Sequence, residues 1–459
     1  MIKEHQATRR QFLRASAVLT ASAPFLLPSR LWAAAGEAQP TAKIVMGFIG
    51  TGYQSQHLMN NFLSSDEVQV VAVCDVDSTR REAARKKAEE FYTKKTGQEF
   101  KGCTEYKDFR ELLNRKEIDA VCIATPDHWH AIPTLAVLRS GKDVYCEKPL
   151  THNIHEAVEV LKAVDANGRV LQTGSMQRSS NEFRVACELV RNGIIGEIEK
   201  VECSFGDPVR PCDLPEETPE PGLDWNLWCG PAPVRPYNSA LCPRGIPEGF
   251  PAWRTYLEYG SGGVGDWGAH HLDIAQWGLG MDDSGPVEVI PPADTNARRG
   301  AKLVYAGGIT VEHKDGFGIH FFGKKGEVLV NRGQFVLVLD GKTVASFTEE
   351  QKKKGASGAP ETTCSFEVQK AERAYLANAP IKLYVSRQHI TDFLECVRSR
   401  KKPITSEQVG ARSAICCHLF NQSYYHHARL KWDPAKFEFI GGTGDPKWLT
   451  RDYRSPWTV

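Results

Sequence analysis

The stretch FIGTGYQSQH, residues 48–57, decides the fold of the first half of this chain. It follows an apolar strand and opens a helix. Gly50 permits a tight turn, and Gly52 lets the backbone approach a pyrophosphate at the helix N-terminus, where free N–H groups point. Ser55 replaces the third glycine of the usual pattern and is small enough for close packing of helix on strand. The stretch therefore predicts a dinucleotide-binding turn.

Strands and helices alternate downstream of this turn. The expected strands are continuous apolar runs separated by helical segments, and they lie at 43–49, 68–74, 120–124, 143–146 and 170–173. This order predicts an α/β fold with a parallel sheet that helices cover on both faces.

Asp75 ends the second strand, at the spacing from the glycine turn that dinucleotide-binding folds use. Its carboxylate is placed to accept hydrogen bonds from ribose hydroxyls and would repel a 2′-phosphate. NAD is therefore the expected cofactor rather than NADP, although Arg80 nearby leaves NADP open.

The N-terminal stretch TRRQFLRASAVL, residues 8–19, resembles a twin-arginine export signal, which sends folded proteins across a membrane. An apolar run at 15–27 and alanines at 33–35 complete the pattern and predict a signal peptide over 1–35. The expected location is periplasmic or otherwise exported, by way of the twin-arginine machinery and without a stable membrane anchor. A cofactor made in the cytoplasm would have to bind before export.

The composition excludes one class of partner. The chain has 57 basic and 56 acidic residues and no basic stripe, so we expect no nucleic-acid binding. Its 13 cysteines are scattered, many of them in apolar runs, which is typical of buried thiols. Disulfides near Cys212, Cys229 and Cys242 remain open.

Three further motifs together resemble the Gfo/Idh/MocA family, which includes glucose–fructose oxidoreductase and inositol dehydrogenase. They are ATPDHWHA (124–131), CEKPL (146–150) and GSGGVGDWGAHHLD (260–273). The resemblance implies an NAD-binding Rossmann domain at 41–173. It also implies a C-terminal α/β domain at 174–459, whose open, mainly antiparallel sheet takes part in substrate binding and homo-oligomer formation.

Short alternating runs agree with a second sheet of this kind. They lie between glycine turns at 303–305, 309–313, 317–322, 327–331 and 335–339.

The glycine turn and the motifs supply the expected cofactor-binding residues, which are Gly50, Gly52, Tyr53, Gln54, Asp75, Thr125, Pro126, His128, His130, Glu147 and Lys148.

The resemblance also implies a catalytic group made of Lys148, Asp266 and His270. Asp266 and His270 are four residues apart in an expected helix at 266–277, so they would share a face. A neutral histidine suits removal of a hydroxyl proton, and Lys148 would stabilise the developing alkoxide. His271 follows directly, and the spacing favours His270 as the base.

The same segment also permits a metal hypothesis. Asp266, His270, His271 and Asp273 are possible ligands, but adjacent histidines on a helix diverge and no recognised zinc spacing is present, so no metal is predicted.

A proline-rich stretch between residues 208 and 251 contains several aromatic residues. Flat aromatic faces suit the apolar faces of a sugar ring, so Trp225, Trp228 and Tyr259, together with His271, are the expected substrate contacts. The alternative is that these aromatic side chains pin the loop to the domain.

The function expected from these features is hydride transfer between a tightly bound NAD(H) and a hydroxyl carbon of a sugar or glycoside, in an exported oxidoreductase. One alternative is an NAD-dependent glycosidase that oxidises a ring hydroxyl, eliminates the aglycone, adds water and reduces the ring again. Another is a non-catalytic carbohydrate- or NAD-binding protein.

Overall fold

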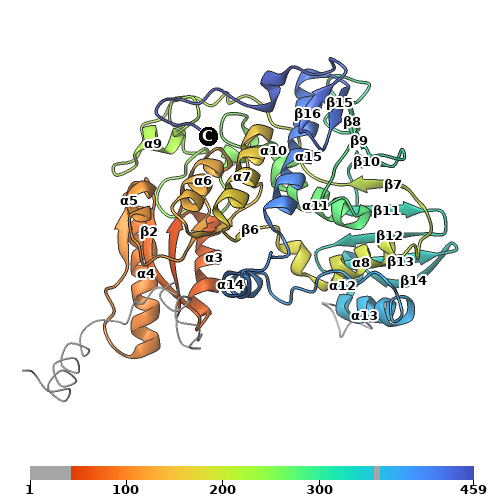
Figure 1. Ribbon diagram of the computed structural model, residues 1–459, viewed down its shortest axis with the longest axis horizontal. Helices are drawn as coiled ribbons and strands as arrows, with labels where there is room; N and C mark the ends of the chain where they lie inside the picture. The colour runs from red at the N-terminus through yellow and green to blue at the C-terminus, as the bar shows by residue number, and fades with distance from the viewer. Residues whose placement is uncertain (1–42, 356–361) are drawn as a thin grey trace, which may run out of the picture.

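The computed structural model describes residues 43–355 and 362–459, so the predicted signal peptide at 1–35 lies outside the described residues. Two sheets lie at opposite ends of the molecule, with helices between them (Figure 1). Among the described residues, no helix combines the length and apolar character needed to cross a bilayer.

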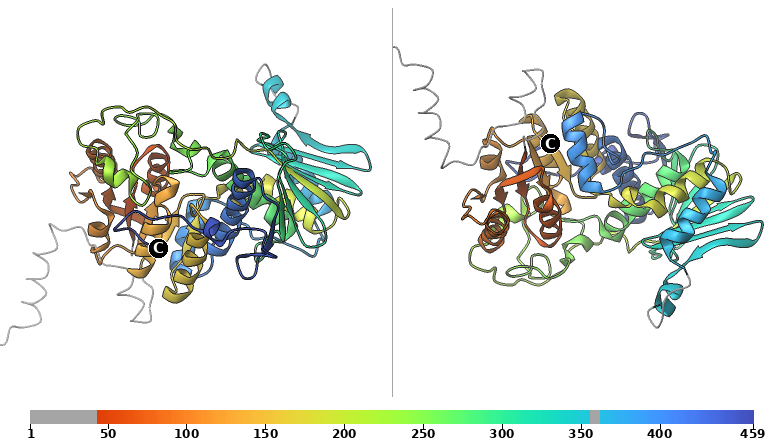
Figure 2. Two further views of the ribbon diagram at one scale, coloured as in Figure 1. Left: turned by 90° about the horizontal axis from the view of Figure 1, so that it is seen from above. Right: turned by 90° about the horizontal axis from the view of Figure 1, so that it is seen from below.

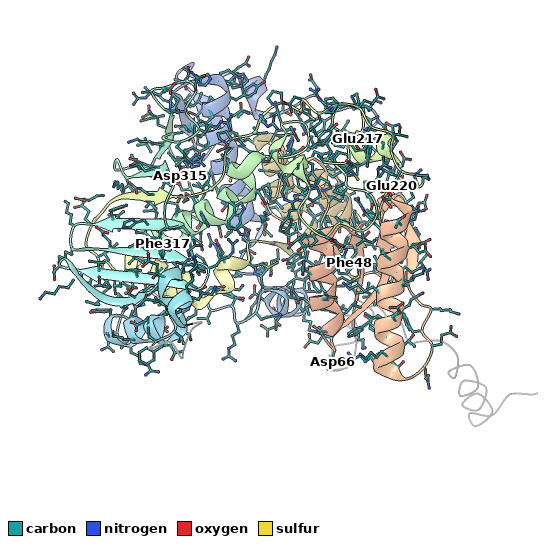
Figure 3. The ribbon with its side chains drawn as sticks, turned by 180° about the vertical axis from the view of Figure 1, so that it is seen from behind. Phe48, Asp66, Glu217, Glu220, Asp315 and Phe317 are labelled. Carbon is teal, nitrogen blue, oxygen red and sulfur yellow. The ribbon has the colours of Figure 1, made fainter. Side chains whose placement is uncertain are left out.

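The first sheet is parallel, with strand order β3-β2-β1-β4-β5-β6, which is the Rossmann order. Its strands are β1 (Ile44–Ile49), β2 (Val68–Cys74), β3 (Thr104–Tyr106), β4 (Ala120–Ile123), β5 (Asp143–Cys146) and β6 (Leu171–Thr173). Every residue of β1, including Phe48 (Figure 3), is buried, as expected for a central strand with helices on both faces.

The helices of this half are α3 (Tyr53–Ser64), α4 (Ser78–Thr96), α5 (Phe109–Leu113), α6 (Ala131–Arg139) and α7 (Ile154–Asn167). Their ends follow local chemistry. Asp77 caps α4 by accepting hydrogen bonds from the backbone N–H groups of Thr79 and Arg80, and Gly97 ends the helix with a φ of 70°.

The second sheet is mixed and mostly antiparallel, in the order β14-β13-β12-β11-β7-β10-β9-β8-β15-β16. Only β7 and β10 pair in parallel among its described pairs. The strands are β7 (Ile198–Cys203), β8 (Glu288–Ile290), β9 (Lys302–Val304), β10 (Thr310–His313), β11 (Ile319–Gly323), β12 (Gly326–Asn331), β13 (Gln334–Leu339), β14 (Lys342–Phe347), β15 (Leu430–Asp433) and β16 (Glu438–Ile440).

Helices cover one face of this sheet and leave the other face open (Figure 2). The remaining helices are α8 (Asn181–Arg191), α9 (Trp225–Cys229), α10 (Gly262–Asp266), α11 (Gly268–Leu279), α12 (Glu349–Gly355), α13 (Cys364–Tyr375), α14 (His389–Ser399) and α15 (Glu407–His426). Short 3₁₀ helices are η1 (Asp127–Trp129), η2 (Met176–Ser179), η3 (Ala252–Thr255) and η4 (Pro446–Leu449).

Helix α14 packs on the first sheet although it lies late in the chain. The Phe393 ring lies 6.2 Å from Phe62 and 5.8 Å from Tyr145, and the Gln172 amide donates to the His389 carbonyl oxygen at 2.7 Å. Part of the predicted 174–459 segment therefore completes the hydrophobic core of the first domain.

The segment between β7 and α10 crosses back to the first domain and contains a small core of its own. Ser78 N–H donates to the Gly222 carbonyl oxygen at 3.1 Å, and Leu223 bridges to Asp77. Figure 3 shows Glu217 and Glu220 of this segment beside the first domain. All the cysteines are free thiols, including Cys212, Cys229 and Cys242.

Candidate active site

A cavity of about 650 Å³ lies at the carboxyl edge of the first sheet. The residue directly after each of five strands lines it, and these residues are Gly50, Asp75, Ala124, Glu147 and Gly174. In a sheet of this order, ligands bind where the strand order reverses, which is here between β1 and β4.

The glycine turn has the geometry that the sequence predicts. Gly50 has a φ of 82°, and a Cβ there would lie 2.8 Å from the backbone of Ala124 and Thr125, so only glycine fits. Gly52 precedes α3 and has open space where a Cβ would be. The N-terminus of α3 therefore offers free N–H groups to an anion beside the cavity.

Asp75 and Arg80 hydrogen-bond to different parts of the protein. Asp75 Oδ2 accepts from Thr51 N at 2.8 Å and from Thr51 Oγ1 at 3.0 Å, which ties the carboxylate to the glycine turn. The Arg80 guanidinium donates to the carbonyl oxygens of Gly245, at 3.0 Å, and Pro243. Arg80 is thus held by the crossing segment, which leaves it poorly placed to bind a 2′-phosphate.

Several buried polar atoms on the cavity wall have no hydrogen-bond partner among the described residues. They are Thr125 Oγ1, both amide atoms of Gln177, Arg254 Nη1 and His270 Nδ1. Buried polar groups are normally satisfied, so these atoms indicate the place of a polar ligand. The turn, the carboxylate and the orphaned atoms together fit a dinucleotide.

Lys148 and Asp266 form an ion pair on this wall. The Lys148 ammonium also donates to the Asp266 carbonyl oxygen at 3.0 Å, and Arg254 Nε lies 3.6 Å from the same carboxylate. Burial works against ionisation of Asp266, but Lys148 and Arg254 outweigh it and hold the pKa of the carboxyl below its usual value. Asp266 is therefore an anion that fixes Lys148.

His270 lines the cavity beside this pair. Burial, with the charges of Lys148 and Arg332, holds its pKa well below the usual value, so the ring is neutral near pH 7. The predicted continuous helix at 266–277 is wrong, because α10 ends at Asp266 and α11 begins at Gly268. Asp266 and His270 nevertheless face the same cavity across the junction at Trp267.

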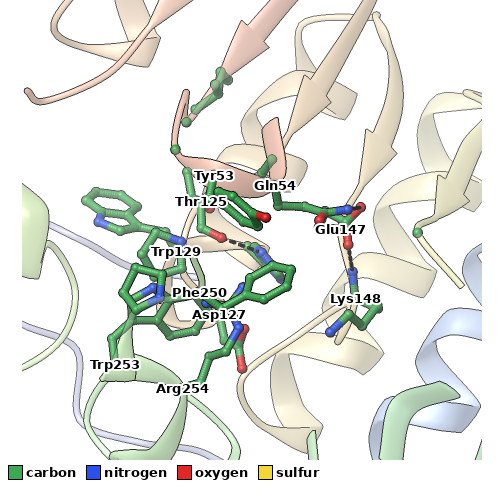
Figure 4. A pocket seen from close by; sticks show the side chains of 18 of the residues that line it. Tyr53, Gln54, Thr125, Asp127, Trp129, Glu147, Lys148, Phe250, Trp253 and Arg254 are labelled. Atoms are coloured by element: carbon green, nitrogen blue, oxygen red, sulfur yellow. Dashed lines mark hydrogen bonds between the residues drawn. The ribbon is translucent and has the colours of Figure 1, made fainter. Parts of the chain in front are cut away.

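The neighbouring motifs are packed into the wall (Figure 4). Glu147 accepts hydrogen bonds from the Gln54 amide at 3.0 Å and from Lys148 N at 3.3 Å, and burial raises the pKa of its carboxyl. The ring nitrogens of His130 face the carbonyl oxygens of Pro149 at 2.6 Å and Thr125 at 2.9 Å. His130 thereby joins two motifs that line the cavity.

All but one of the expected cofactor-binding residues line the cavity. Those that do are Gly50, Gly52, Tyr53, Gln54, Asp75, Thr125, Pro126, His130, Glu147 and Lys148. His128 does not, because its ring is buried between the carbonyl oxygens of Tyr259 and Trp228, at 3.2 and 2.9 Å. Its expected place in the cofactor crevice is corrected to a structural one.

Of the four expected substrate contacts, only one lines the cavity. Trp228 lines the cavity, but Tyr259, Trp225 and His271 lie outside its lining. Tyr259 is fully buried and donates to Pro233 O at 3.3 Å, Trp225 stacks on Trp228 at 4.5 Å, and His271 Nδ1 faces Ser204 O at 2.5 Å. For Trp225 and Tyr259 the alternative that they pin the loop describes the structure better.

Further residues line the cavity that were not expected from the sequence. They are Asp127, Trp129, Gln177, Phe250, Trp253, Arg254, Trp267 and Arg332. Asp127 accepts from Ser261 N at 3.1 Å, and burial raises its pKa to about 7, against the charges of Lys148 and Arg254. The position of Asp127 shortly after the end of β4 could have indicated in the sequence that it lines the cavity. Within 43–355 and 362–459, no three His, Cys, Asp or Glu side chains are grouped to hold a metal ion.

Comparison with known proteins gives relatives of several activities. A "Glycosyl hydrolase family 109 protein" of Stenotrophomonas maltophilia is 29% identical over 54% of this chain and 50% of its own length. An "Inositol 2-dehydrogenase" of Salmonella typhimurium is 32% identical over 33% of this chain and 42% of its own length. The chain thus spans about half the length, or less, of these curated relatives.

A solved inositol dehydrogenase homologue of Azotobacter vinelandii, complexed with NADH and myo-inositol, has the same fold. It matches with a TM-score of 0.53 and 18% identity, over 85% of this chain and 98% of that one.

Two family models match, and they cover both halves of the protein. One describes an oxidoreductase family with an NAD-binding Rossmann fold and matches residues 44–175, and the other describes the C-terminal alpha/beta domain of that family and matches residues 209–459. The chain belongs to the Gfo/Idh/MocA oxidoreductase family, and its N-terminal domain is the NAD-binding Rossmann fold of that family.

Proposed function

We propose that this protein transfers a hydride between a hydroxyl carbon of a sugar or glycoside and a tightly held NAD(H), so that the alcohol and the corresponding ketone are interconverted. One observation carries the proposal: Lys148, Asp266 and His270 meet on the wall of the cavity that begins at the glycine turn. Bound nicotinamide supplies the hydride acceptor or donor there.

The chain's own residues supply the proton chemistry. His270 is neutral, and its buried Nδ1 has no partner among the described residues, so it is suited to accept the hydroxyl proton. Lys148 donates to the same oxygen and stabilises alkoxide character. Asp266 pairs with the Lys148 ammonium and orients it.

Aromatic side chains support a sugar as the substrate. Trp253 and Phe250 line the cavity with the Arg254 guanidinium over both rings, 4.3 and 4.5 Å from their centres (Figure 4). Trp267 lines it as well and is 49% exposed. Such faces pack against the C–H faces of a sugar ring.

The crossing segment supports retention of the cofactor. Leu241, Pro247, Phe250 and Pro251 of this segment line the cavity, and Arg80 holds the segment to the first domain. We propose that NAD is bound in the cytoplasm and carried out by the twin-arginine pathway that residues 8–19 indicate. Replacing Arg9 and Arg10 by lysine should retain the protein in the cytoplasm; continued export would contradict the pathway.

An NAD-dependent glycosidase is the second candidate, favoured by the similarity to a glycosyl hydrolase family 109 protein. The same residues would then oxidise a ring hydroxyl to a ketone, and the aglycone would leave by elimination. Water would add to the resulting double bond and the ketone would be reduced again, with no net redox change.

The open face of the second sheet supports a homo-oligomer (Figure 2). Glu202 pairs on this face with Lys200 and Lys314, at 2.7 and 3.0 Å. The mass of the protein in solution tests this proposal, and a monomer would contradict it.

The deciding experiment uses purified, untreated protein. Denaturation should release NAD or NADH, and a panel of sugars and glycosides should change the absorbance of the bound cofactor. A persistent keto-sugar identifies a dehydrogenase, and a released sugar without redox change identifies a glycosidase. Protein that neither contains nor binds NAD would refute both, and protein that binds NAD but converts no member of the panel would indicate a non-catalytic binding protein.

A further inference from the structure

Arg332 and Trp267 both line the cavity. Arg332 lies in the turn between β12 and β13, far along the chain from the other lining residues. Its guanidinium carbon lies 4.6 Å from the centre of the Trp267 ring. Stacking on an indole orients a guanidinium while leaving its N–H groups available.

Among the residues that the structure describes, the charge of Arg332 has no counter-ion in contact. No described residue makes an ion pair or a hydrogen bond with its side chain. The nearby carboxylates are committed elsewhere, because Asp266 pairs with Lys148 and Arg254, and Glu182 accepts from Gly333 N at 3.2 Å. The second sheet therefore presents an uncommitted cation to the cavity.

Gln177 gives a second, independent indication of a ligand at the cavity. Its side chain is only 3% exposed and lines the cavity, and neither its amide nitrogen nor its amide oxygen has a partner in the described part of the chain. A buried amide of this kind suits a hydroxyl group, which both donates and accepts. Beside the other unpartnered atoms of its wall, the cavity thus offers a neutral amide, Gln177, and a cation, Arg332, that no described residue engages by hydrogen bond or ion pair.

We propose that Arg332 binds a carboxylate of the substrate, so that the preferred substrates are acidic sugars of the uronate type. The inference rests on the proposed function. A guanidinium binds a carboxylate through two parallel hydrogen bonds, and a single uncommitted cation matches a single negative charge. Asp266 balances the charges of Lys148 and Arg254, whereas no described carboxylate forms an ion pair with Arg332.

The test measures binding to NAD-loaded protein by calorimetry, with D-glucuronate and D-galacturonate against D-glucose and D-galactose. We expect the two acids to bind at least about tenfold more tightly than the two neutral sugars. We also expect the affinity of the acids to fall with added salt. Arg332→Gln should lower the affinity for the acids about tenfold or more and leave the neutral sugars within about twofold, and Arg332→Lys should be intermediate. Arg298→Gln, at an exposed arginine that pairs with Asp207, is the matched control and should change neither.

Acids that bind no better than neutral sugars, or an equal effect of Arg332→Gln on both classes, would overturn the inference. Tighter, Arg332-dependent binding of D-glucose 6-phosphate would overturn the choice of a carboxylate. Failure of the proposed function looks different: the wild-type protein would bind a sugar without any change in the absorbance of its cofactor.

Discussion

The charge on Asp266 determines what Lys148 can do. Asp266 is anionic because two cations face it, and it holds the ammonium group against the cavity wall. The family resemblance implied these two residues and His270 as the catalytic group, and all three line the cavity. Arg332 could not be predicted, since it reaches the site from a hairpin turn whose local sequence gives no signal of this kind.

Lys148→Ala should lower turnover by on the order of 10²–10⁴, because the alkoxide loses its nearest cation and Asp266 loses its main partner. The content of bound NAD should stay unchanged. Turnover and released nucleotide are the two measurements, and Lys162→Ala, at an exposed lysine paired with Glu159, is the control. Undiminished turnover in Lys148→Ala would show that the catalytic group is assigned wrongly.

Asp75→Ala should weaken NADH binding by about tenfold and shift the preference toward NADPH, because the carboxylate that accepts from a ribose and repels a phosphate is removed. Fluorescence titration with NADH and NADPH measures the ratio of the two affinities. A general loss of stability would not change this ratio. Asp66→Ala, at an exposed carboxylate of the same domain, serves as control (Figure 3). An unchanged ratio would exclude Asp75 from ribose recognition.

At the scale of elements, strands that carry an apolar pattern could be predicted, including the three-residue β6 and β9, and an exposed strand without such a pattern could not. The edge strand β3 has three residues, none of them buried, so it leaves no hydrophobic pattern. The place of α14 on the first sheet is a long-range contact that local sequence does not encode. The junction between α10 and α11 likewise depends on tertiary contacts of the glycine run.

Gly263→Ala should destabilise the protein by about 1–3 kcal/mol and lower turnover, because a Cβ there would lie 2.4 Å from the backbone of Gly206. To relieve this clash, the backbone would have to shift, and the shift would move α10, which carries Asp266. Gly268→Ala is the control, since its Cβ would meet Phe205 at an ordinary 3.5 Å. The melting temperature and the turnover are measured for both variants. Equal values for the two variants would contradict the role given to the close approach of Gly263 to Gly206.

At the scale of the whole molecule, the C-terminal tail and α15 join the parts that form the cavity. Trp457 packs on Trp129, with ring centres 4.7 Å apart, and Arg451 pairs with the fully buried Glu156 at 2.9 Å. Because Trp129 lines the cavity, the last residues of the chain support the cofactor wall.

Buried neutral histidines should make the fold sensitive to acid. Burial lowers the pKa of five of them from 6.5, to about 3 for His128 and to about 4 for His271, His313, His389 and His418. The unfolded chain binds protons at these positions below pH 6.5 while the folded chain does not, so stability is lost as the pH falls from about 6.5 toward 4. Burial also raises the pKa of four carboxyl groups, which act in the opposite direction but are fewer; they are Asp77, Asp127, Glu147 and Asp273.

The melting temperature should therefore fall between pH 7 and pH 5, and calorimetry in two buffers of different ionisation enthalpy should detect net proton uptake on unfolding at pH 5.5. A melting temperature that rises over this range, or net proton release, would show that these histidines are not buried in their neutral form.

The central claim is that the nicotinamide ring lies where Lys148, Asp266 and His270 converge. A crystal structure of the protein with NADH tests it most directly. The account predicts the pyrophosphate at the N-terminus of α3, the adenosine ribose at Asp75, and the reactive face of the nicotinamide toward Lys148 and His270. A nicotinamide bound away from these two side chains would contradict it.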